Sequence, residues 1–146
     1  LIPEERIECE HNMDMAYNKA KEIIKKYPHI KGFLGASSYD PPGAAKAIDE
    51  LGMTGQIHAV GTGVPSVSQP YLESGSNPCV LCWDPALSGK AMCQLAVMIL
   101  EGNEDQIQTG LDLGIEGYNS VTVDGTNISG NAILVIDKEN MADYAF

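Results

Sequence analysis

The stretch Gly32-Phe-Leu-Gly-Ala-Ser-Ser-Tyr-Asp-Pro-Pro-Gly-Ala-Ala-Lys-Ala-Ile48 decides the fold of this chain. Its apolar opening, residues 33–36, stops at two hydroxyls and a turn, and alanines then recur at helical spacing. This order predicts a buried strand, a polar tip and a helix, which together are half of a βαβ unit. Ligands of open parallel sheets bind outside the carboxyl ends of the strands, so we expect Ser37 and Ser38 to lie where binding occurs.

Similar strand ends follow at Val60-Gly-Thr-Gly63 and at Val80-Leu-Cys-Trp-Asp84. Parallel strands place their carboxyl ends at one edge of a sheet, so three such ends predict one ligand-facing rim. The glycines around Thr62 are weak evidence for a phosphate loop, because a third glycine and a helix start are missing.

The rest of the sequence continues the alternation of strands and helices. Strands are expected at residues 5–10, 32–36, 56–60, 79–83 and 133–136, and helices at 12–27, 42–52, 66–74, 85–100 and 138–144. Between residues 110 and 125 we expect hairpin-like segments, with Asp124-Gly125 as a turn. The sequence therefore predicts an α/β fold: one three-layer, Rossmann-like, mostly parallel sheet flanked by helices, without an internal linker.

The composition is that of an ordinary globular protein. The chain has 146 residues, of which 44% are hydrophobic and 20% charged, and a net charge of −11. This size suits one domain, and the negative charge argues against a nucleic-acid or anionic-membrane surface. No apolar run approaches the ~20 residues that span a bilayer. The first six residues lack the pattern of a secretory signal, although removal of a signal would leave the same beginning.

Cysteines and histidines are the candidate metal ligands. They are Cys9, Cys79, Cys82, Cys93, His11, His29 and His58. The CxxC of Cys79 and Cys82 lies in an expected strand, where its odd spacing sends the side chains to opposite faces. No second CxxC or histidine cluster completes a zinc set. We therefore expect buried structural thiols, surface or partly buried histidines, no metal and no cofactor.

Several motifs together resemble the carboxy-terminal lobe of type I periplasmic sugar-binding proteins, nearest the rhamnose-binding and autoinducer-2-binding receptors of ABC importers. The matching text is Asn12-Met-Asp-Met-Ala-Tyr17, Tyr27-Pro-His-Ile-Lys-Gly32, Ala36-Ser-Ser-Tyr-Asp-Pro-Pro-Gly-Ala-Ala45, Val60-Gly-Thr-Gly-Val-Pro-Ser66, Gln69-Pro-Tyr-Leu-Glu-Ser-Gly75, Leu81-Cys-Trp-Asp-Pro-Ala-Leu-Ser-Gly89 and Asp137-Lys-Glu-Asn140. These motifs cover nearly the whole chain in order. No one of them is specific, but the set is.

The resemblance implies a fold of two α/β lobes that close on a sugar, of which residues 1–146 are the carboxy-terminal lobe. The expected first strand has no preceding βα unit, which leaves a sheet edge open. We therefore expect that the chain is truncated on its amino-terminal side, so that the amino-terminal lobe is a missing partner. The resemblance also implies ABC permease subunits as partners and an extracytoplasmic location, in the periplasm or as a cell-surface lipoprotein. A homo-oligomer of the truncated lobe is a further possibility.

The resemblance also assigns ligand-binding residues. Ala36, Ser37 and Ser38 occupy the ligand-facing positions of the autoinducer-2 branch, where common pentose and hexose binders have Asn-Asp. Trp83 matches the branch's cleft tryptophan, and Asp84 matches the acidic or amide residue after it. Thr62 follows the expected strand at residues 56–60 and lies between these two groups in the sequence.

One departure bears on specificity. Gly63 stands where common binders carry an aspartate. Together with the serines, this departure favours a small deoxysugar or a furanosyl-type ligand.

Each of these residues also has a structural interpretation. Trp83 can pack on a sugar face or lie in the core. Asp84 can accept sugar hydroxyls, cap the helix that starts at Pro85, or do both. The two serines can form a simple turn. Asp40 is expected to cap its helix rather than to touch the ligand, and residues 124–127 to form a hairpin turn rather than a calcium loop.

The sequence predicts a binding module rather than an enzyme: the substrate-binding component of an ABC importer, for a small sugar or sugar-like signal of the rhamnose or autoinducer-2 type. One alternative is the sugar-sensing effector domain of a transcriptional repressor. A Rossmann-like enzyme would need a nucleophile–base pair, a metal set or a dinucleotide fingerprint, and the sequence shows none of these.

Overall fold

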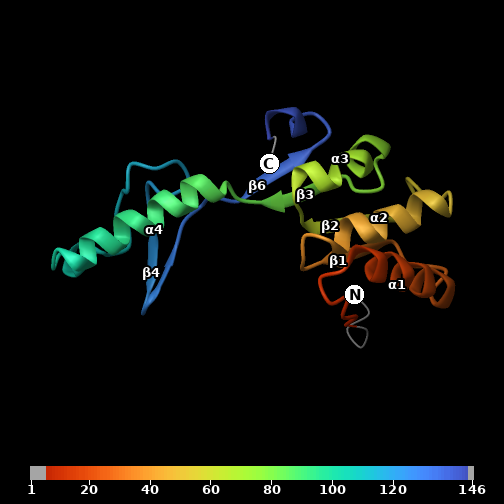
Figure 1. The fold of residues 1–146 in the computed structure, drawn as a ribbon, viewed down its shortest axis with the longest axis horizontal. Coiled ribbons are helices and arrows are strands. Elements are labelled where there is room, and N and C mark those ends of the chain that lie inside the picture. The colour runs from red at the N-terminus through yellow and green to blue at the C-terminus, as the bar shows by residue number, and fades with distance from the viewer. Residues whose placement is uncertain (1–5, 145–146) are drawn as a thin grey trace. The chain divides into compact units, whose positions relative to one another are not determined.

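The computed structural model of the chain describes residues 6–144, in which helices and strands alternate for most of the length (Figure 1). The α-helices are α1 (Met13–Lys26), α2 (Asp40–Glu50), α3 (Pro65–Ser74) and α4 (Pro85–Leu100). The strands are β1 (Gly32–Gly35), β2 (His58–Thr62), β3 (Cys79–Cys82), β4 (Thr122–Asp124), β5 (Asn127–Ser129) and β6 (Leu134–Asp137). Short 3₁₀ turns occur at η1 (Glu104–Gln106) and η2 (Met141–Asp143).

The helices begin and end at local signals in the sequence. The side chain of Asn12 accepts a hydrogen bond from the amide of Met15 at 2.9 Å and so caps α1. Prolines occupy the first turns of α2, α3 and α4, where their missing N–H costs nothing. Helix α3 ends at Gly75, which adopts a left-handed φ of 87°.

The main sheet has the strand order β1-β2-β3-β6. Strand β2 pairs in parallel with β1, where Gly35 faces Gly61, and with β3, where Thr62 faces Leu81. The predicted α/β class, with a mostly parallel sheet flanked by helices, is confirmed.

The described chain divides into two compact units, whereas the sequence predicted one layered structure without a linker. Unit 1 comprises residues up to Cys82 together with those from Val135 onward, and unit 2 comprises Trp83–Leu134. The division has a physical basis, because each unit buries an apolar cluster of its own.

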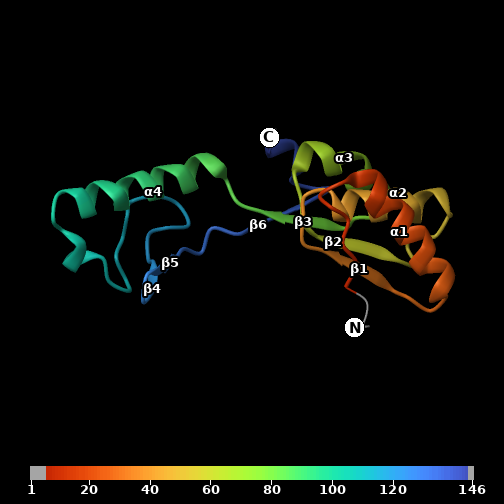
Figure 2. The same cartoon turned by 60° about the horizontal axis from the view of Figure 1, so that its bottom comes forward.

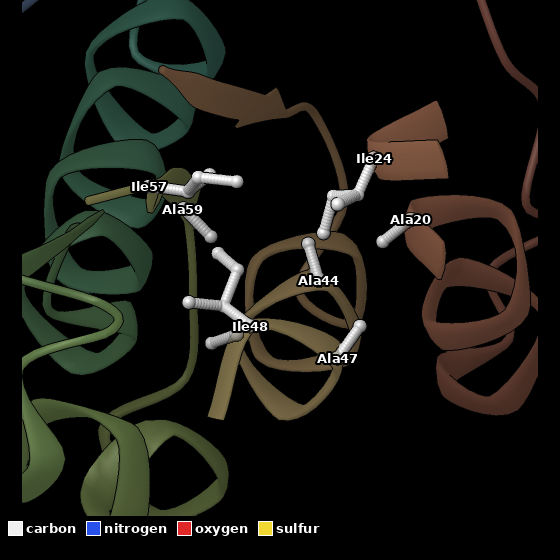
Figure 3. Close-up of a cluster of buried hydrophobic side chains, with 8 residues drawn as sticks. Ala20, Ile24, Ala44, Ala47, Ile48, Ile57 and Ala59 are labelled. Atoms are coloured by element: carbon white, nitrogen blue, oxygen red, sulfur yellow. The ribbon is translucent and has the colours of Figure 1, made fainter. Parts of the chain in front are cut away.

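The core of unit 1 lies between α1, α2 and the sheet. Figure 3 shows Ile48 of α2 pointing toward Ala59 of the sheet, while Ala44 points toward α1. The cluster consists of Ala20, Ile24, Ala44, Ala45, Ala47, Ile48, Ile57 and Ala59. Its many alanines let the helices approach closely. A Cβ added at Gly43 would lie only 2.6 Å from the Cβ of Ala16, so the first turn of α2 packs directly against α1.

The helices of unit 1 lie on one face of its sheet (Figure 2). Ala59 and Val80 point to this face and are fully buried. Leu34 and Leu81 alternate with inward-facing residues, point to the opposite face, and are 76% and 38% exposed. Among the described residues, the far face of this sheet therefore carries exposed apolar side chains and no helix of unit 1, so unit 1 has two layers and not the three that were predicted.

Unit 2 is built on α4. Its buried residues are Ala91, Leu113 and Val121, and half-buried Leu95 and Met98 pack against them. One face of α4 thus packs in this unit against residues between 111 and 128, among them Val123 of β4 and Ile128 of β5 in the antiparallel hairpin. The predicted turn is confirmed, and Gly125 in it has a φ of 58°.

Two predicted elements are wrong. Residues 6–10 form no strand; residue 5 lies outside the described residues. A strand is stable only when another pairs with it, and β1, the nearest strand in the sequence, pairs only with β2 in the described sheet. Only the turn η2 occurs where a helix was predicted at 138–144. Residues 110–113 form no regular strand, but they exchange backbone hydrogen bonds with residues 118–121, in keeping with the hairpin-like segment that was predicted there.

The expectation of buried thiols holds for one cysteine of the CxxC. Cys82 is buried, whereas Cys79 is half-buried because it opens the strand. Cys93 is exposed on α4 and Cys9 is half-buried before α1. Within the described residues, no helix has the length and apolarity that crossing a membrane requires.

Candidate functional site

The carboxyl ends of β1, β2 and β3 meet at one edge of the main sheet, because the three strands are parallel neighbours. The strand ends that the sequence singled out are therefore brought together by the fold. Within unit 1, this edge carries Ala36, Ser37 and Ser38 after β1, and Thr62 at the end of β2. We call residues 36–39 the β1–α2 loop.

Asp40 holds the β1–α2 loop in place. Its Oδ2 accepts hydrogen bonds from the backbone amides of Ser37 at 2.9 Å and Ala36 at 3.2 Å, while its own amide donates to the carbonyl of Ser37 at 3.2 Å. The prediction that Asp40 caps its helix is therefore wrong in detail: Tyr39 is the N-cap residue, and the carboxylate binds the preceding loop instead of helical amides. Because both amides donate to Asp40, they are not available to a ligand, and the side chains of the loop remain for binding.

The two serines differ in what they offer. Both residues are half-buried, but the Oγ of Ser37 is shielded from solvent and has no hydrogen-bond partner among the described residues. A shielded hydroxyl without a partner is energetically unfavourable, so a rotation that brings it to a ligand would be favoured. Ser38 shares the same loop, which puts two hydroxyls at the edge of the sheet.

The glycines on either side of Thr62 serve the packing of the sheet. A Cβ added at Gly61 would lie 2.0 Å from the carbonyl oxygen of Gly35, so β1 and β2 can pair closely only because a glycine stands there. A Cβ added at Gly63 would lie 2.5 Å from Cγ1 of Val80. The structure therefore leaves no room for the aspartate that common sugar binders carry at position 63.

Trp83 and Asp84 belong to unit 2 and directly follow β3 in the chain. The side chain of Trp83 is not a core residue, because 49% of its surface is exposed. Asp84 caps α4: its Oδ1 accepts hydrogen bonds from the amides of Ala86 at 2.7 Å and Leu87 at 3.2 Å. The predicted cap is confirmed. Both bonds use Oδ1, so Oδ2 has none among the described hydrogen bonds and can accept one from a ligand.

Sequence reasoning missed two aromatic residues beside the β1–α2 loop. The rings of His11 and Tyr39 meet edge to face, with their centroids 4.8 Å apart and their planes at 80°. Tyr39 adjoins the serines and could have been noticed for that reason. His11 precedes α1 and is far from Tyr39 in sequence, so no local pattern indicates this pair.

Electrostatic and metal-binding features are sparse at this edge. Burial and the nearby charge of Asp40 both raise the pKa of the Cys9 thiol. In the part of the chain that the structure describes, no group of three or more His, Cys, Asp or Glu side chains is placed to hold a metal ion.

Comparisons with solved structures identify the fold. The chain is similar to LsrB from Clostridium saccharobutylicum in complex with AI-2 (TM-score 0.74, 20% identity), with 100% of this chain and 49% of that one covered. It is also similar to an ABC transporter solute-binding protein from Clostridium phytofermentas with bound L-rhamnose (TM-score 0.73, 20% identity, 94% and 46% covered). A third, from Agrobacterium vitis with bound alpha-D-tagatopyranose, has a TM-score of 0.70 and 22% identity, with 97% and 41% covered.

The chain thus spans less than half the length of these structures, and identities at this level show the fold alone. The family model described as "Periplasmic binding protein domain" matches residues 2–104, which is more than half of the chain. With its parallel sheet and the polar edge at the ends of β1 and β2, the chain belongs to the periplasmic binding protein domain family.

Proposed function

We propose that this chain is a ligand-binding lobe of the solute-binding component of an ABC importer, and that it captures a small sugar or sugar-like signal of the rhamnose or autoinducer-2 type. The observation that carries the proposal is the meeting of three parallel strand ends at one edge, which bears the β1–α2 loop and Thr62, in a chain of this family. Ligands of open parallel sheets bind at this position.

The chemistry of the edge suits a neutral polyol. Hydroxyls of Ser37, Ser38 and Thr62 can each donate and accept, as the hydroxyls of a sugar do. In unit 2, the exposed indole of Trp83 provides a flat apolar face and an N–H donor, and Oδ2 of Asp84 is a charged acceptor. An indole of this kind suits the C–H face of a sugar ring, and hydroxyls and a carboxylate suit its hydroxyl groups.

The absence of a side chain at position 63 supports a small ligand of this class. A carboxylate there would grip two hydroxyls of a pentose or hexose, and the contact of Gly63 with Val80 leaves no room for one. Structures similar to this chain hold AI-2 and L-rhamnose, and also a hexose. The smaller or deoxygenated ligands fit an edge that offers hydroxyls rather than carboxylates in unit 1.

The proposal includes partners and location. The full-length protein would hold the ligand between this lobe and an amino-terminal lobe, close around it, and present both lobes to the permease outside the cytoplasm. It would act by binding, without catalysis. This chain covers less than half the length of the similar structures, which supports the proposal that the full-length protein has a second lobe.

Titration calorimetry of the full-length protein with L-rhamnose, AI-2 and D-tagatose tests the function. We expect saturable heat with at least one of the first two ligands. Ser38→Ala and Thr62→Val should each weaken that binding by about 5- to 100-fold, because each removes a hydrogen bond to the ligand and leaves a ligand hydroxyl unpaired.

Matched controls are available on the exposed hairpin of unit 2, where Thr122→Val and Ser129→Ala make the same chemical changes at residues that belong neither to the β1–α2 loop nor to a strand of the main sheet. They should leave the affinity unchanged. Absence of heat with all three sugars, or equal effects of the edge and hairpin variants, would contradict the proposed function.

A further inference from the structure

The turn that leads into α1 has an unusual sequence for its shape. The amide of Asn12 donates to the carbonyl of Cys9 at 2.8 Å, and the two central residues, Glu10 and His11, have φ values of 47° and 55°. Positive φ at both central positions is typical of a type I′ turn, which glycine, asparagine and aspartate favour. Among the described residues, only these two have positive φ without being glycine. Such strain persists where the surrounding structure requires the side chain, and it clusters at binding sites.

His11, one of the two strained residues, contacts the β1–α2 loop through its ring. The ring of His11 meets the ring of Tyr39 edge to face, with the centroids 4.8 Å apart. An edge-to-face pair at this distance is attractive beyond the area it buries. Tyr39 is the last residue of the β1–α2 loop, and its carbonyl accepts the first bond of α2 from Gly43 at 3.1 Å.

Two further observations place the turn firmly beside the loop. The close packing of Gly43 against Ala16 and the carbonyl of Met13 brings the first turns of α1 and α2 together. Burial and, as the second cause, the charge of Asp40 raise the pKa of the Cys9 thiol, which agrees with a position of the turn near the base of the loop. The α1 entry turn, residues 9–12, therefore lies beside the β1–α2 loop as a fourth segment of the rim in unit 1.

We propose that His11 is a positioning residue, which holds Tyr39 by the ring contact and thereby fixes the Ser37–Ser38 loop in its binding-competent conformation. This inference rests on the proposed function for its effect on sugar affinity, but the ordering of the loop can be measured without a ligand. The attraction between the two rings offsets the free energy of strain in the α1 entry turn.

The decisive variant is His11→Asn, because asparagine tolerates positive φ and carries no ring. We expect its melting temperature to be equal to or higher than that of the parent protein. Hydrogen exchange of the amides of Ala36 and Ser37, which are hydrogen-bonded to Asp40, should nevertheless become faster. The affinity for the sugar that the parent binds should fall by about 2- to 10-fold. A merely structural residue would move stability and affinity in the same direction.

Two companion variants sharpen the test. Glu10→Asn relieves the neighbouring strain without touching the ring pair, so it should leave loop exchange and affinity unchanged. His11→Phe keeps a ring at position 11, but phenylalanine is a bulky residue at a positive φ, so the melting temperature should fall. The loop should stay protected and the affinity should be retained. Both variants thus change the turn while a ring remains at position 11 to contact Tyr39.

The inference is overturned if His11→Asn leaves loop exchange unchanged in the free full-length protein, or if Glu10→Asn accelerates it equally. If the parent protein binds none of the tested sugars, the proposed function fails, while the exchange comparison still decides whether His11 orders the loop.

Discussion

The carboxylate of Asp40 reaches back from the first turn of α2 and accepts the backbone amide of Ser37 at 2.9 Å. The same oxygen accepts the amide of Ala36 at 3.2 Å. Asp40→Ala would leave two amides of the β1–α2 loop without partners, and we expect a loss of about 1–3 kcal/mol in the free energy of unfolding. Urea unfolding followed by circular dichroism measures it.

Asp40→Asn is the matched control, since its amide oxygen keeps an acceptor in the same place but removes the charge. It should lose about half as much stability as the alanine variant, because hydrogen bonds to charged groups are roughly twice as strong. Equal stability of the parent and the alanine variant would show that the loop does not depend on this carboxylate.

Gly43 lies where α1 and α2 touch. Replacement by alanine ordinarily stabilises a helix by about 0.5–1 kcal/mol, but here the new Cβ would lie 2.6 Å from both Ala16 Cβ and the carbonyl oxygen of Met13. We expect Gly43→Ala to destabilise the protein by about 1–3 kcal/mol through overpacking. Thermal unfolding of Gly89→Ala in α4 is the comparison, because its added Cβ meets nothing within 4 Å and should stabilise its helix. A stabilising effect at both positions would rule out close contact between the helices.

Two fully buried serines in unit 1 differ in their hydrogen bonds. Ser68 Oγ has no partner among the described residues, whereas Ser76 Oγ lies 3.0 Å from Ser74 Oγ. Ser68→Ala should therefore raise the free energy of unfolding by about 0.5–2 kcal/mol, since it removes a buried hydroxyl that is not satisfied. Ser76→Ala should lower it by about 1 kcal/mol. The prediction is wrong if chemical denaturation gives both variants the same sign.

Thiol labelling reports on the surroundings of Cys9. Burial comes first and the charge of Asp40 second among the causes that raise the pKa of this thiol, so less thiolate is present at pH 8 than an ordinary cysteine would have. Iodoacetamide followed by mass spectrometry should modify exposed Cys93 before Cys9. Asp40→Asn should accelerate the labelling of Cys9, and an unchanged rate would show that the two groups are apart.

The sign of the pH effect follows from the same shift. A raised thiol pKa means that the folded chain holds its proton to higher pH than the unfolded chain does. The contribution of Cys9 to stability is therefore fully present below the pKa of the unfolded thiol and is lost as the pH rises through the folded value.

Elements with local signals were predictable from the sequence. Helix α4 runs from Pro85 to Leu100 as expected, and α3 ends before Gly75, because a proline, a cap and a left-handed glycine act within a few residues of themselves. Strand β2 was placed two residues too early, since its extent depends on pairing with β1, in which Gly61 faces Gly35. A pairing partner is not visible in the strand's own sequence.

The candidate site was likewise predictable only where its signals are local. Strand ends could be recognised one by one, and the parallel order of β1, β2 and β3 then brings them together. The direction in which Asp40 bonds and the contact of His11 with Tyr39 were not predictable. Both depend on how the first turns of two helices pack, which no periodicity within either helix encodes.

The chain leaves unit 1 after Cys82 and returns to it at Val135, where β6 joins the sheet and Lys138 donates to the carbonyl of Glu73 at 3.0 Å. During synthesis, the ribosome must therefore make all of residues 83–134 before the fourth strand can be added. A nascent chain that stalls within this span would display β3 as an unprotected edge, open to pairing with other chains. Chaperone dependence should accordingly be greatest while residues 83–134 are being synthesised.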